Sequence, residues 1–357
     1  MYAGLIDRQS ERASPTQALI AEARRRQRDR RRRSARLILA LALVIAAVAT
    51  GAIGLTAGGE RAPDTTSGWQ LAGPKQPMPL QLVVWTGGFR IEVISSRTGR
   101  VVRTLATNVG LYRGTPTLAV SSAGVVYFDT ARDREEWIES TPLTGGRVTT
   151  VAAGYLPSIS QNGKLLAYVD YTSQPEAIVV RNLATGATRT WAFISDVADI
   201  SGLSWSPDNR FLAYTASYWA HAGQTPVDVT RLLDTRSGGT LANQPRIPLR
   251  HGLDWAGFLT VHVGMAVASY PGSRRSLVAI ATGTGRVLRR LIVLPHQELS
   301  VDNAYDGTEG TITADATGHD VLIATAGPRG YGEILRWTAG TRHLIRVTAG
   351  ALRAAWG

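Results

Sequence analysis

Few residues in this chain have the types and spacing that catalysis or metal binding requires. The chain contains no cysteine, and its six histidines are scattered without an H-x-H or H-E-x-x-H pattern. A serine hydrolase would place its nucleophile in a G-x-S-x-G turn, and no such turn occurs. We therefore expect no thiol catalysis, no histidine-bound zinc, no catalytic residues and no cofactor.

One oxygen-rich segment is a candidate for metal binding. Asp302, Asp306 and Glu309 lie close together in the chain, and carboxylates are the ligands that Ca²⁺ prefers. Their spacing does not match that of an EF-hand loop. We favour a polar loop here and keep Ca²⁺ binding as the alternative.

An aromatic segment is a candidate for ligand contact. Tyr218, Trp219 and His221 lie within residues 217–224, between two apolar stretches. Long loops carry binding function more often than the elements they connect, and aromatic side chains are frequent at interfaces. A loop packed on itself is the simpler interpretation, and a ligand-binding loop is the alternative.

The first 80 residues divide into three segments by composition. Residues 1–36 form a basic tail with one short predicted helix, and residues 37–57 are uncharged and almost wholly apolar. At 1.5 Å per residue an apolar helix of this length covers about 30 Å, the hydrocarbon thickness of a bilayer. Residues 58–80 are rich in glycine, proline and threonine, which is typical of a flexible linker.

The charges flanking the apolar run predict its orientation. Positive residues concentrate on the cytoplasmic side of a membrane span. Five arginines directly precede the run and set this topology: Arg30, Arg31, Arg32, Arg33 and Arg36. We expect a single-pass protein of the cell membrane with a cytoplasmic N-terminus and an extracytoplasmic domain. A cleaved signal peptide is the alternative, because residues 47–49 resemble a cleavage site.

The net charge of +12 is concentrated at the N-terminus. Residues 1–36 hold eleven arginines and four acidic residues, a net +7, which leaves +5 for the remaining 321 residues. The basic tail would contact anionic lipids, and a cytoplasmic protein partner is the alternative. Almost no aromatic residue is interleaved with these arginines, so we expect no nucleic-acid binding.

Residues 81–357 contain two alternating β-hairpin patterns. One pattern joins two apolar strands through a tight turn, as in SGLSWSPDNRFLAYT (201–215) and LPSISQNGKLLAYVD (156–170). The other carries a turn glycine, because a tight turn needs a positive φ. These glycines recur at intervals of 41–55 residues, at Gly99, Gly145, Gly186, Gly238, Gly285 and Gly340.

Six such units of four strands predict an all-β, six-bladed β-propeller. The segment that begins near residue 82 lacks its first strand, and residues 352–356 match that missing strand. We therefore expect the C-terminal strand to complete the first blade and close the ring, which removes an exposed sheet edge. Five tryptophans fall inside these strand patterns and are expected in the core between blades: Trp85, Trp205, Trp255, Trp337 and Trp356.

The phrases LSWSPDNRFLAY and PSISQNGKLLAYV resemble the repeat of TolB-like β-propellers, which are related in style to WD-repeat proteins. The resemblance covers about 275 residues and implies fold rather than function, because such propellers serve as binding platforms, sensors and gating domains. The basic tail and single span are similar to actinobacterial membrane proteins encoded with extracytoplasmic-function sigma factors, some of which are anti-sigma factors.

Together these features predict a membrane-anchored extracytoplasmic propeller without catalytic activity. Its face would bind a protein, a peptide or an envelope component, and the tail could act on a sigma factor. The alternative is a propeller enzyme of the hydrolase or lactonase type with Ca²⁺ in its central channel. Carboxylates that converge in the channel would favour the enzyme, whereas a lining of small residues would favour the binding platform.

Overall fold

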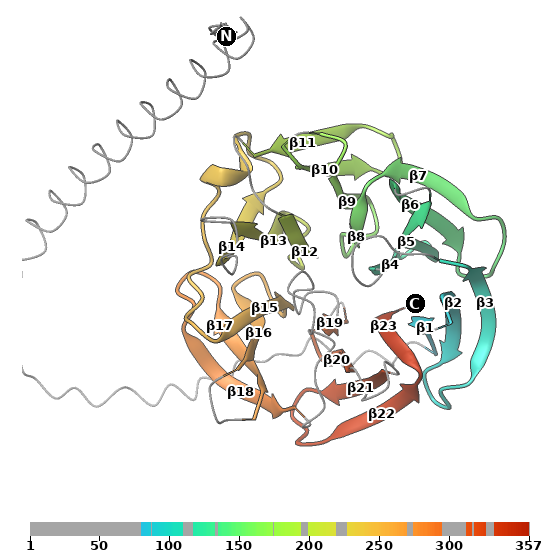
Figure 1. The fold of residues 1–357 in the computed structure, drawn as a ribbon. Coiled ribbons are helices and arrows are strands. Elements are labelled where there is room, and N and C mark those ends of the chain that lie inside the picture. Colours follow the sequence, from blue (N-terminus) through green and yellow to red (C-terminus); the bar gives the residue numbers. More distant parts are fainter. Residues whose placement is uncertain are drawn as a thin grey trace, which may run out of the picture. The chain divides into compact units, whose positions relative to one another are not determined.

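The computed structural model describes eleven stretches of the chain: residues 80–86, 88–109, 117–132, 135–173, 175–193, 199–218, 227–269, 274–294, 312–315, 318–325 and 332–356. Their strands form six antiparallel sheets arranged around a central axis (Figure 1). The predicted six-bladed β-propeller is therefore confirmed.

Each blade is numbered in chain order and is given from its innermost strand outward. Blade 1 contains β23 (Ala351–Trp356), β1 (Gln81–Thr86), β2 (Arg90–Ser95) and β3 (Val101–Thr107). Blade 2 contains β4 (Leu118–Val120), β5 (Val125–Arg132), β6 (Glu135–Pro142) and β7 (Thr149–Ala153). Blade 3 contains β8 (Tyr155–Ile159), β9 (Leu165–Asp170), β10 (Ala177–Asn182) and β11 (Thr188–Ala192).

The second half of the ring has the same order with one exception. Blade 4 contains only β12 (Asp199–Trp205), β13 (Phe211–Tyr218) and β14 (Val227–Asp234). Blade 5 contains β15 (Leu253–Phe258), β16 (Val263–Ala268), β17 (Ser276–Ala281) and β18 (Val287–Val293). Blade 6 contains β19 (Ile312–Ala314), β20 (Asp320–Thr325), β21 (Glu333–Thr338) and β22 (Leu344–Ala349).

The ring is closed by pairing between the two ends of the described chain. β23 runs antiparallel to β1, with Leu82 opposite Trp356 and Val84 opposite Ala354. Figure 1 shows the C-terminal strand beside β1. The predicted closure is confirmed, and it gives β1 hydrogen-bonded neighbours on both sides, β23 and β2.

Blade 4 differs from the predicted four-stranded unit. After β14 the chain forms a short 3₁₀ helix, η1 (Leu241–Asn243), and then a single bridge between Arg231 and Arg246. Pro245 and Pro248 interrupt this stretch, and proline cannot donate a hydrogen bond to a strand ladder. The buried side chain of Leu241 packs instead against the core between blades 3 and 4.

The turn glycines have the predicted conformation in five blades, and the sixth is displaced by one residue. In blade 4 the glycine with positive φ is Gly239 (106°), not Gly238. At Gly285, where φ is 62°, an added Cβ would lie 1.9 Å from the carbonyl oxygen of Pro248. Glycine at this position therefore permits both the turn and the close approach of blade 4 to blade 5.

The apolar core consists of clusters packed between blades. The two largest lie between blades 5 and 6 and between blades 3 and 4. Four of the five tryptophans predicted in the core are less than 9% exposed, and Trp356 packs partly buried against the cluster that joins blades 6 and 1. Their predicted place between blades is confirmed.

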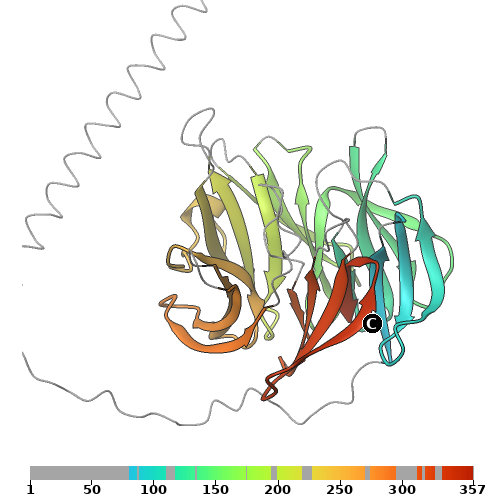
Figure 2. The ribbon, with the colours of Figure 1, turned by 60° about the horizontal axis from the view of Figure 1, so that its bottom comes forward.

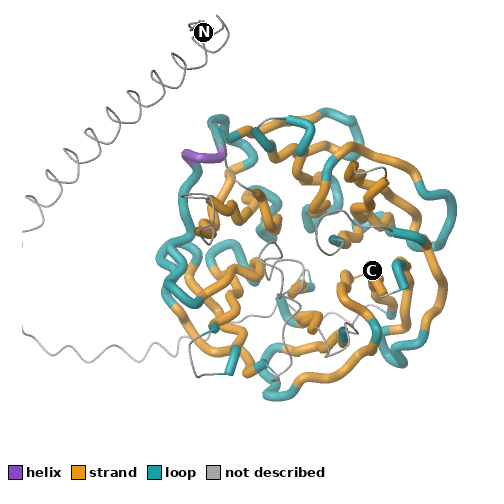
Figure 3. The backbone as a smooth tube through the Cα atoms, in the orientation of Figure 1, coloured by secondary structure: helices purple, strands orange, loops and turns teal. Residues whose placement is uncertain are grey.

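The strands run between two faces of the propeller (Figure 2). Turns and loops alternate with the strands around the whole ring (Figure 3). We call one face the turn face, because in blades 2 to 6 the innermost strand ends there in a short turn to the second strand. The opposite face, where the innermost strands begin, is the loop face. β13 and β18 end at the loop face.

The described residues include no helix that is both long enough and apolar enough to cross a bilayer. The predicted tail, membrane span and most of the linker, residues 1–79, lie outside the described residues.

Candidate functional site

The innermost strands of all six blades surround a central cavity of about 360 Å³. Its walls come from β4, β8, β12, β15, β19 and β23, and residues of the turns that follow β4, β8 and β12 extend it to the turn face. Six segments far apart in the sequence therefore form one channel.

The channel is lined by small, hydroxyl-bearing and aromatic side chains. Ser158, Ser204 and Thr313 contribute polar groups, whereas Trp205 and Phe258 contribute aromatic surface. Asp315 is the single charged residue among the described residues that line the cavity. Its carboxylate accepts hydrogen bonds from the backbone N–H groups of His319 (2.9 Å) and Asp320 (3.3 Å). It thereby stabilises the turn between β19 and β20.

Three indole groups hold neighbouring inner strands together around the channel. Nε1 of Trp205 donates to the carbonyl oxygen of Ser158 in the preceding blade at 3.1 Å. Nε1 of Trp255 likewise donates to Oγ of Ser204 at 3.0 Å. Nε1 of Trp356 donates to the carbonyl oxygen of Thr313 at 3.3 Å. Each bond joins one blade to the blade before it, so the channel wall is fixed by the same residues that pack the core.

The turns at the turn face also contact one another. Oδ1 of Asn209 in blade 4 accepts a hydrogen bond from the backbone N–H of Asn162 in blade 3 at 2.9 Å. Oγ of Ser122 in blade 2 donates to the carbonyl oxygen of Asn162 at 3.3 Å. Asn209 has a φ of 59°, a conformation that asparagine tolerates better than most residues. The turn chemistry of the repeat therefore serves contacts between blades.

A buried carboxyl group lies toward the loop-face ends of the same strands. Asp129, in β5, accepts hydrogen bonds from the backbone N–H of Thr117 (2.7 Å) and of Leu156 (3.1 Å). Burial raises the pKa of Asp129 to about 6, although these two hydrogen bonds and the charge of Arg353 act in the opposite direction. Asp129 therefore positions the starts of two inner strands, β4 and β8.

A second buried group of oxygen atoms joins blades 3 and 4. The hydroxyl of Tyr155 lies 3.0 Å from Oε2 of Glu176 and 2.8 Å from Oδ1 of Asp199. Burial, together with the two carboxylates, holds the pKa of Tyr155 well above its ordinary value. The phenol therefore stays protonated and serves as a hydrogen-bond donor at neutral pH.

These arrangements do not form a nucleophile and base pair. Within the described parts of the chain, no group of three or more histidine, aspartate or glutamate residues could hold a metal ion. The carboxyl groups of Asp129 and Asp199 bond to backbone N–H and phenol groups, and Asp315 stabilises a turn. The described carboxyl groups therefore position elements of the fold.

The structure places one of the residues predicted from the sequence. Tyr218 ends β13, half-buried against the core of blades 3 and 4, and its ring lies edge-on to Phe193 at 6.5 Å. The other predicted site residues lie outside the described residues: Trp219, His221, Asp302, Asp306, Glu309, Arg30, Arg31, Arg32, Arg33 and Arg36.

The residues that position the channel were not identified from the sequence. Asp129 and Tyr155 stand in ordinary strand patterns, and their partners are 12 to 44 residues away in the chain. An acidic residue at a position that the alternating pattern assigns to the core is the signal that could have identified Asp129.

Comparison with solved structures indicates the type of propeller. TolB from Acinetobacter baumannii is similar with a TM-score of 0.51 and 14% identity, over 76% of this chain and 66% of that chain. A putative TolB from Agrobacterium tumefaciens is similar with a TM-score of 0.47 and 14% identity, over 77% of this chain and 90% of that chain. An oligogalacturonate lyase in complex with manganese gives a TM-score of 0.44 and 12% identity, over 78% and 74% of the two chains.

No protein-family model matches the chain, and no curated protein matches it. This chain spans about two thirds of the length of the Acinetobacter protein. Identities of this size show the fold alone, and the chain has a TolB-like six-bladed β-propeller fold.

Proposed function

We propose that this protein is a non-catalytic binding platform whose central channel receives a protein or peptide ligand. The lining of the channel supports this proposal most directly. A strip of serine and threonine oxygens beside aromatic rings suits an extended peptide, which offers backbone N–H and C=O groups and small side chains. An envelope polymer with hydroxyl groups would use the same surface and is the second class of ligand.

The proposal extends to the placement of the protein in the cell. Residues 37–57 would anchor the chain in the cell membrane, with the N-terminus in the cytoplasm and the propeller outside. The support is the uncharged apolar run and the arginines that precede it. Membrane lipids would then contact the span and the tail, and a cytoplasmic partner such as a sigma factor would contact residues 1–36.

The enzyme alternative has less support from the described residues. Ca²⁺ takes six to eight oxygen ligands, commonly including several carboxylates. Among the described residues of the channel wall, Asp315 alone carries a carboxylate, and it bonds to two backbone N–H groups of its own turn. Titration of the full chain with Ca²⁺ tests this alternative, because tight binding that Asp302→Asn and Asp306→Asn abolish would favour the enzyme.

Site-specific photo-crosslinking tests the binding platform. A benzophenone amino acid replaces either Leu203, which lines the channel, or Thr150, which is exposed on β7. In the producing cell, we expect a discrete crosslinked product from position 203 and none from position 150.

A variant that fills the channel provides the control. Ala314→Trp places an indole in the channel wall, whereas Ala192→Trp adds the same group on an exposed outer strand. We expect Ala314→Trp to abolish the crosslink and Ala192→Trp to leave it unchanged. A crosslink that survives Ala314→Trp would place the ligand elsewhere and refute the proposal.

A further inference from the structure

The outer edge of blades 5, 6 and 1 is strongly basic. In each of these blades the outermost strand and the turn before it carry two or three arginines, and the three segments together contain eight arginines and no acidic residue. We call this surface the basic rim and define it as residues 282–293, 339–349 and 96–107. Its strands β18, β22 and β3 follow one another around the propeller (Figure 1).

Most of these arginines have no ion-pair partner among the described residues. Six of the eight are exposed and form no ion pair with any described residue: Arg97, Arg100, Arg286, Arg289, Arg290 and Arg342. The remaining two have partners. Arg346 lies 3.2 Å from Oε1 of Glu333, and Arg103 donates to the carbonyl oxygen of Thr144 in blade 2. Among the described residues, these six cationic groups therefore have no carboxylate partner.

Exposed apolar side chains alternate with these cations. Val101 and Ile345 are each 54% exposed, and Val102, Val287 and Val293 are also exposed. A surface with basic and aliphatic side chains side by side is typical of proteins that lie on anionic bilayers, where the cations contact headgroups and the aliphatic groups enter the interface.

The chain enters the propeller in blade 1, one of the three blades that carry this rim. β1 of blade 1 begins at Gln81, and the apolar run of residues 37–57 ends 24 positions earlier. A glycine- and proline-rich linker of that length has a root-mean-square span of roughly 25–30 Å. If the apolar run spans a membrane, as proposed above, blade 1 is held near the bilayer surface, whereas no such restraint acts directly on blades 3 and 4.

We propose that the basic rim binds anionic phospholipid headgroups and holds the propeller tilted against the membrane. Charge complementarity and the exposed aliphatic groups together favour a lipid surface over a soluble polyanion, which would use the arginines alone. In this orientation the rim faces the bilayer, and the opposite blades extend away from it. The lipid contact goes beyond the proposed binding of a ligand in the channel and does not depend on it.

Vesicle binding by residues 69–357, which form a compact unit of their own, tests the proposal without the apolar run. The probes are vesicles of phosphatidylglycerol and phosphatidylcholine in equal amounts, and vesicles of phosphatidylcholine alone. We expect binding to the anionic vesicles only, and weaker binding at 0.5 M than at 0.1 M salt. Equal binding to both vesicle types, or binding to neither, would overturn the proposal.

Two triple variants with the same loss of charge locate the contact. Arg100→Ala, Arg290→Ala and Arg342→Ala remove one exposed cation from each blade of the rim. Arg147→Ala, Lys164→Ala and Arg236→Ala do the same in blades 2, 3 and 4. A basic residue near an anionic surface changes affinity about fivefold, so we expect about a 100-fold loss from the rim triple and less than about fivefold from the other.

Equal losses from the two triples would show attraction by net charge only and would refute a specific rim. Substitution of the apolar groups, Val101→Ser and Ile345→Ser, should weaken vesicle binding by about threefold each. The protein could instead bind a soluble polyanion such as polyglutamate but not vesicles. If the rim triple variant loses that binding, the ligand of the rim is an anionic polymer and not a lipid. Unchanged melting curves for all variants establish that each still folds.

Discussion

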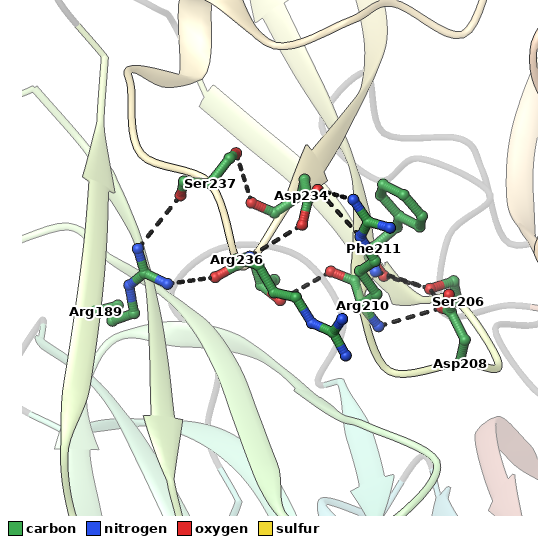
Figure 4. A network of polar contacts seen from close by, with 9 residues as sticks. Arg189, Ser206, Asp208, Arg210, Phe211, Asp234, Arg236 and Ser237 are labelled. Carbon is green, nitrogen blue, oxygen red and sulfur yellow. Dashed lines mark hydrogen bonds and ion pairs between the residues drawn. The ribbon is translucent and has the colours of Figure 1, made fainter.

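Arginines in two regions of this propeller have opposite environments. Where blades 3 and 4 meet, Arg189 donates to the carbonyl oxygens of Thr235 (2.8 Å) and Ser237 (3.4 Å) in the neighbouring blade. Arg210 binds Oδ2 of Asp234 through Nη2 at 2.6 Å and Nε at 3.1 Å. Figure 4 shows these side chains in one network. On the basic rim, six arginines have no such partner among the described residues.

The difference shows that the position of an arginine in the ring determines its role. At the seam of blades 3 and 4, the guanidinium groups satisfy carbonyl oxygens and a carboxylate that belong to turns, so they join elements of the fold. In blades 5 and 6, the exposed arginines Arg286, Arg289, Arg290 and Arg342 form no ion pair with a described residue. We therefore expect them to contribute little to folding, which leaves them available for an external partner.

Removal of the closing strand should have the largest effect. β23 belongs to blade 1 of the basic rim and also supplies Arg353, whose charge acts on the buried Asp129 of blade 2. Deletion of residues 350–357 exposes the edge of β1 and the side chains beneath it. We expect a loss of roughly 5 kcal/mol or more and a melting temperature lower by about 10 °C or more.

Deletion of Gly357 alone is the control, because it leaves every β23–β1 pair intact. Thermal unfolding followed by circular dichroism measures both variants. A melting curve unchanged by the longer deletion would contradict ring closure and, with it, the assignment of β3 to a blade adjacent to β22.

Acidification should have the second-largest effect on stability, through the buried side chain of Asp129 in blade 2. Burial raises the pKa of Asp129 to about 6, above the ordinary 3.8, so the folded state binds this proton more tightly than the unfolded state. The contribution of Asp129 to stability therefore increases as pH falls from above 6 toward 4, by up to about 3 kcal/mol. Asp129→Asn removes this dependence.

Urea unfolding of wild type and Asp129→Asn between pH 4 and pH 7.5 measures the difference. We expect the wild type to gain stability relative to the variant as the pH is lowered through 6. Parallel profiles over this range would show that Asp129 has an ordinary pKa, and that its two backbone hydrogen bonds and Arg353 offset the effect of burial.

The ion pair between Arg210 and Asp234 should contribute less to stability than the protonation of Asp129. The hydrogen bond from Arg210 is the main cause that holds the pKa of Asp234 below its ordinary value. The contribution of this ion pair to the free energy of unfolding is therefore complete above pH 4. It is lost as the pH falls through the lowered pKa of Asp234. The side chain of Arg210 is 43% exposed, so solvent screens the pair. A double-mutant cycle to alanine should still give a favourable coupling energy at pH 7, larger than that of an ion pair on the basic rim.

The same cycle on Arg346 and Glu333 provides the comparison from the basic rim. Their shortest nitrogen–oxygen distance is 3.2 Å and Arg346 is 67% exposed, so we expect at most about 0.3 kcal/mol. Equal coupling energies in the two cycles would remove the proposed distinction between the seam and the rim.

The fold could be predicted from the sequence because short local patterns, repeated in successive blades, determine it. Turn glycines with positive φ, such as Gly186 and Gly340, mark each hairpin, and the likeness of residues 352–356 to other inner strands predicted the closure. The prediction failed in blade 4, where Pro245 and Pro248 prevent a fourth strand although the preceding hairpin pattern is ordinary. The composition of the chain did not indicate that blade 4 would lack its outermost strand.

The channel and the basic rim could not be predicted because each is assembled from distant segments. Asp129 is identified as a positioning residue only by its bonds to Thr117 and Leu156. The rim arginines belong to a region whose net charge of +5 is unremarkable for its length. Their concentration on one side appears only when blades 5, 6 and 1 are placed next to one another.

The smallest expected effect is that of the rim arginines on stability. Arg289→Ala and Arg290→Ala remove exposed side chains that bond to no described residue, and surface substitutions of this kind change stability by about 0.5 kcal/mol or less. Arg189→Ala is the matched substitution at the seam. It removes the donor to the carbonyl oxygen of Thr235 and one of the two donors to that of Ser237, which keeps Nε1 of Trp191 at 3.2 Å. It also removes the guanidinium that lies 5.2 Å from the centre of the Trp191 ring. We therefore expect Arg189→Ala to cost about 1–2 kcal/mol in urea unfolding. A rim variant as destabilised as the seam variant would mean that the rim arginines are part of the fold, and the surface would then have no spare charge for a membrane.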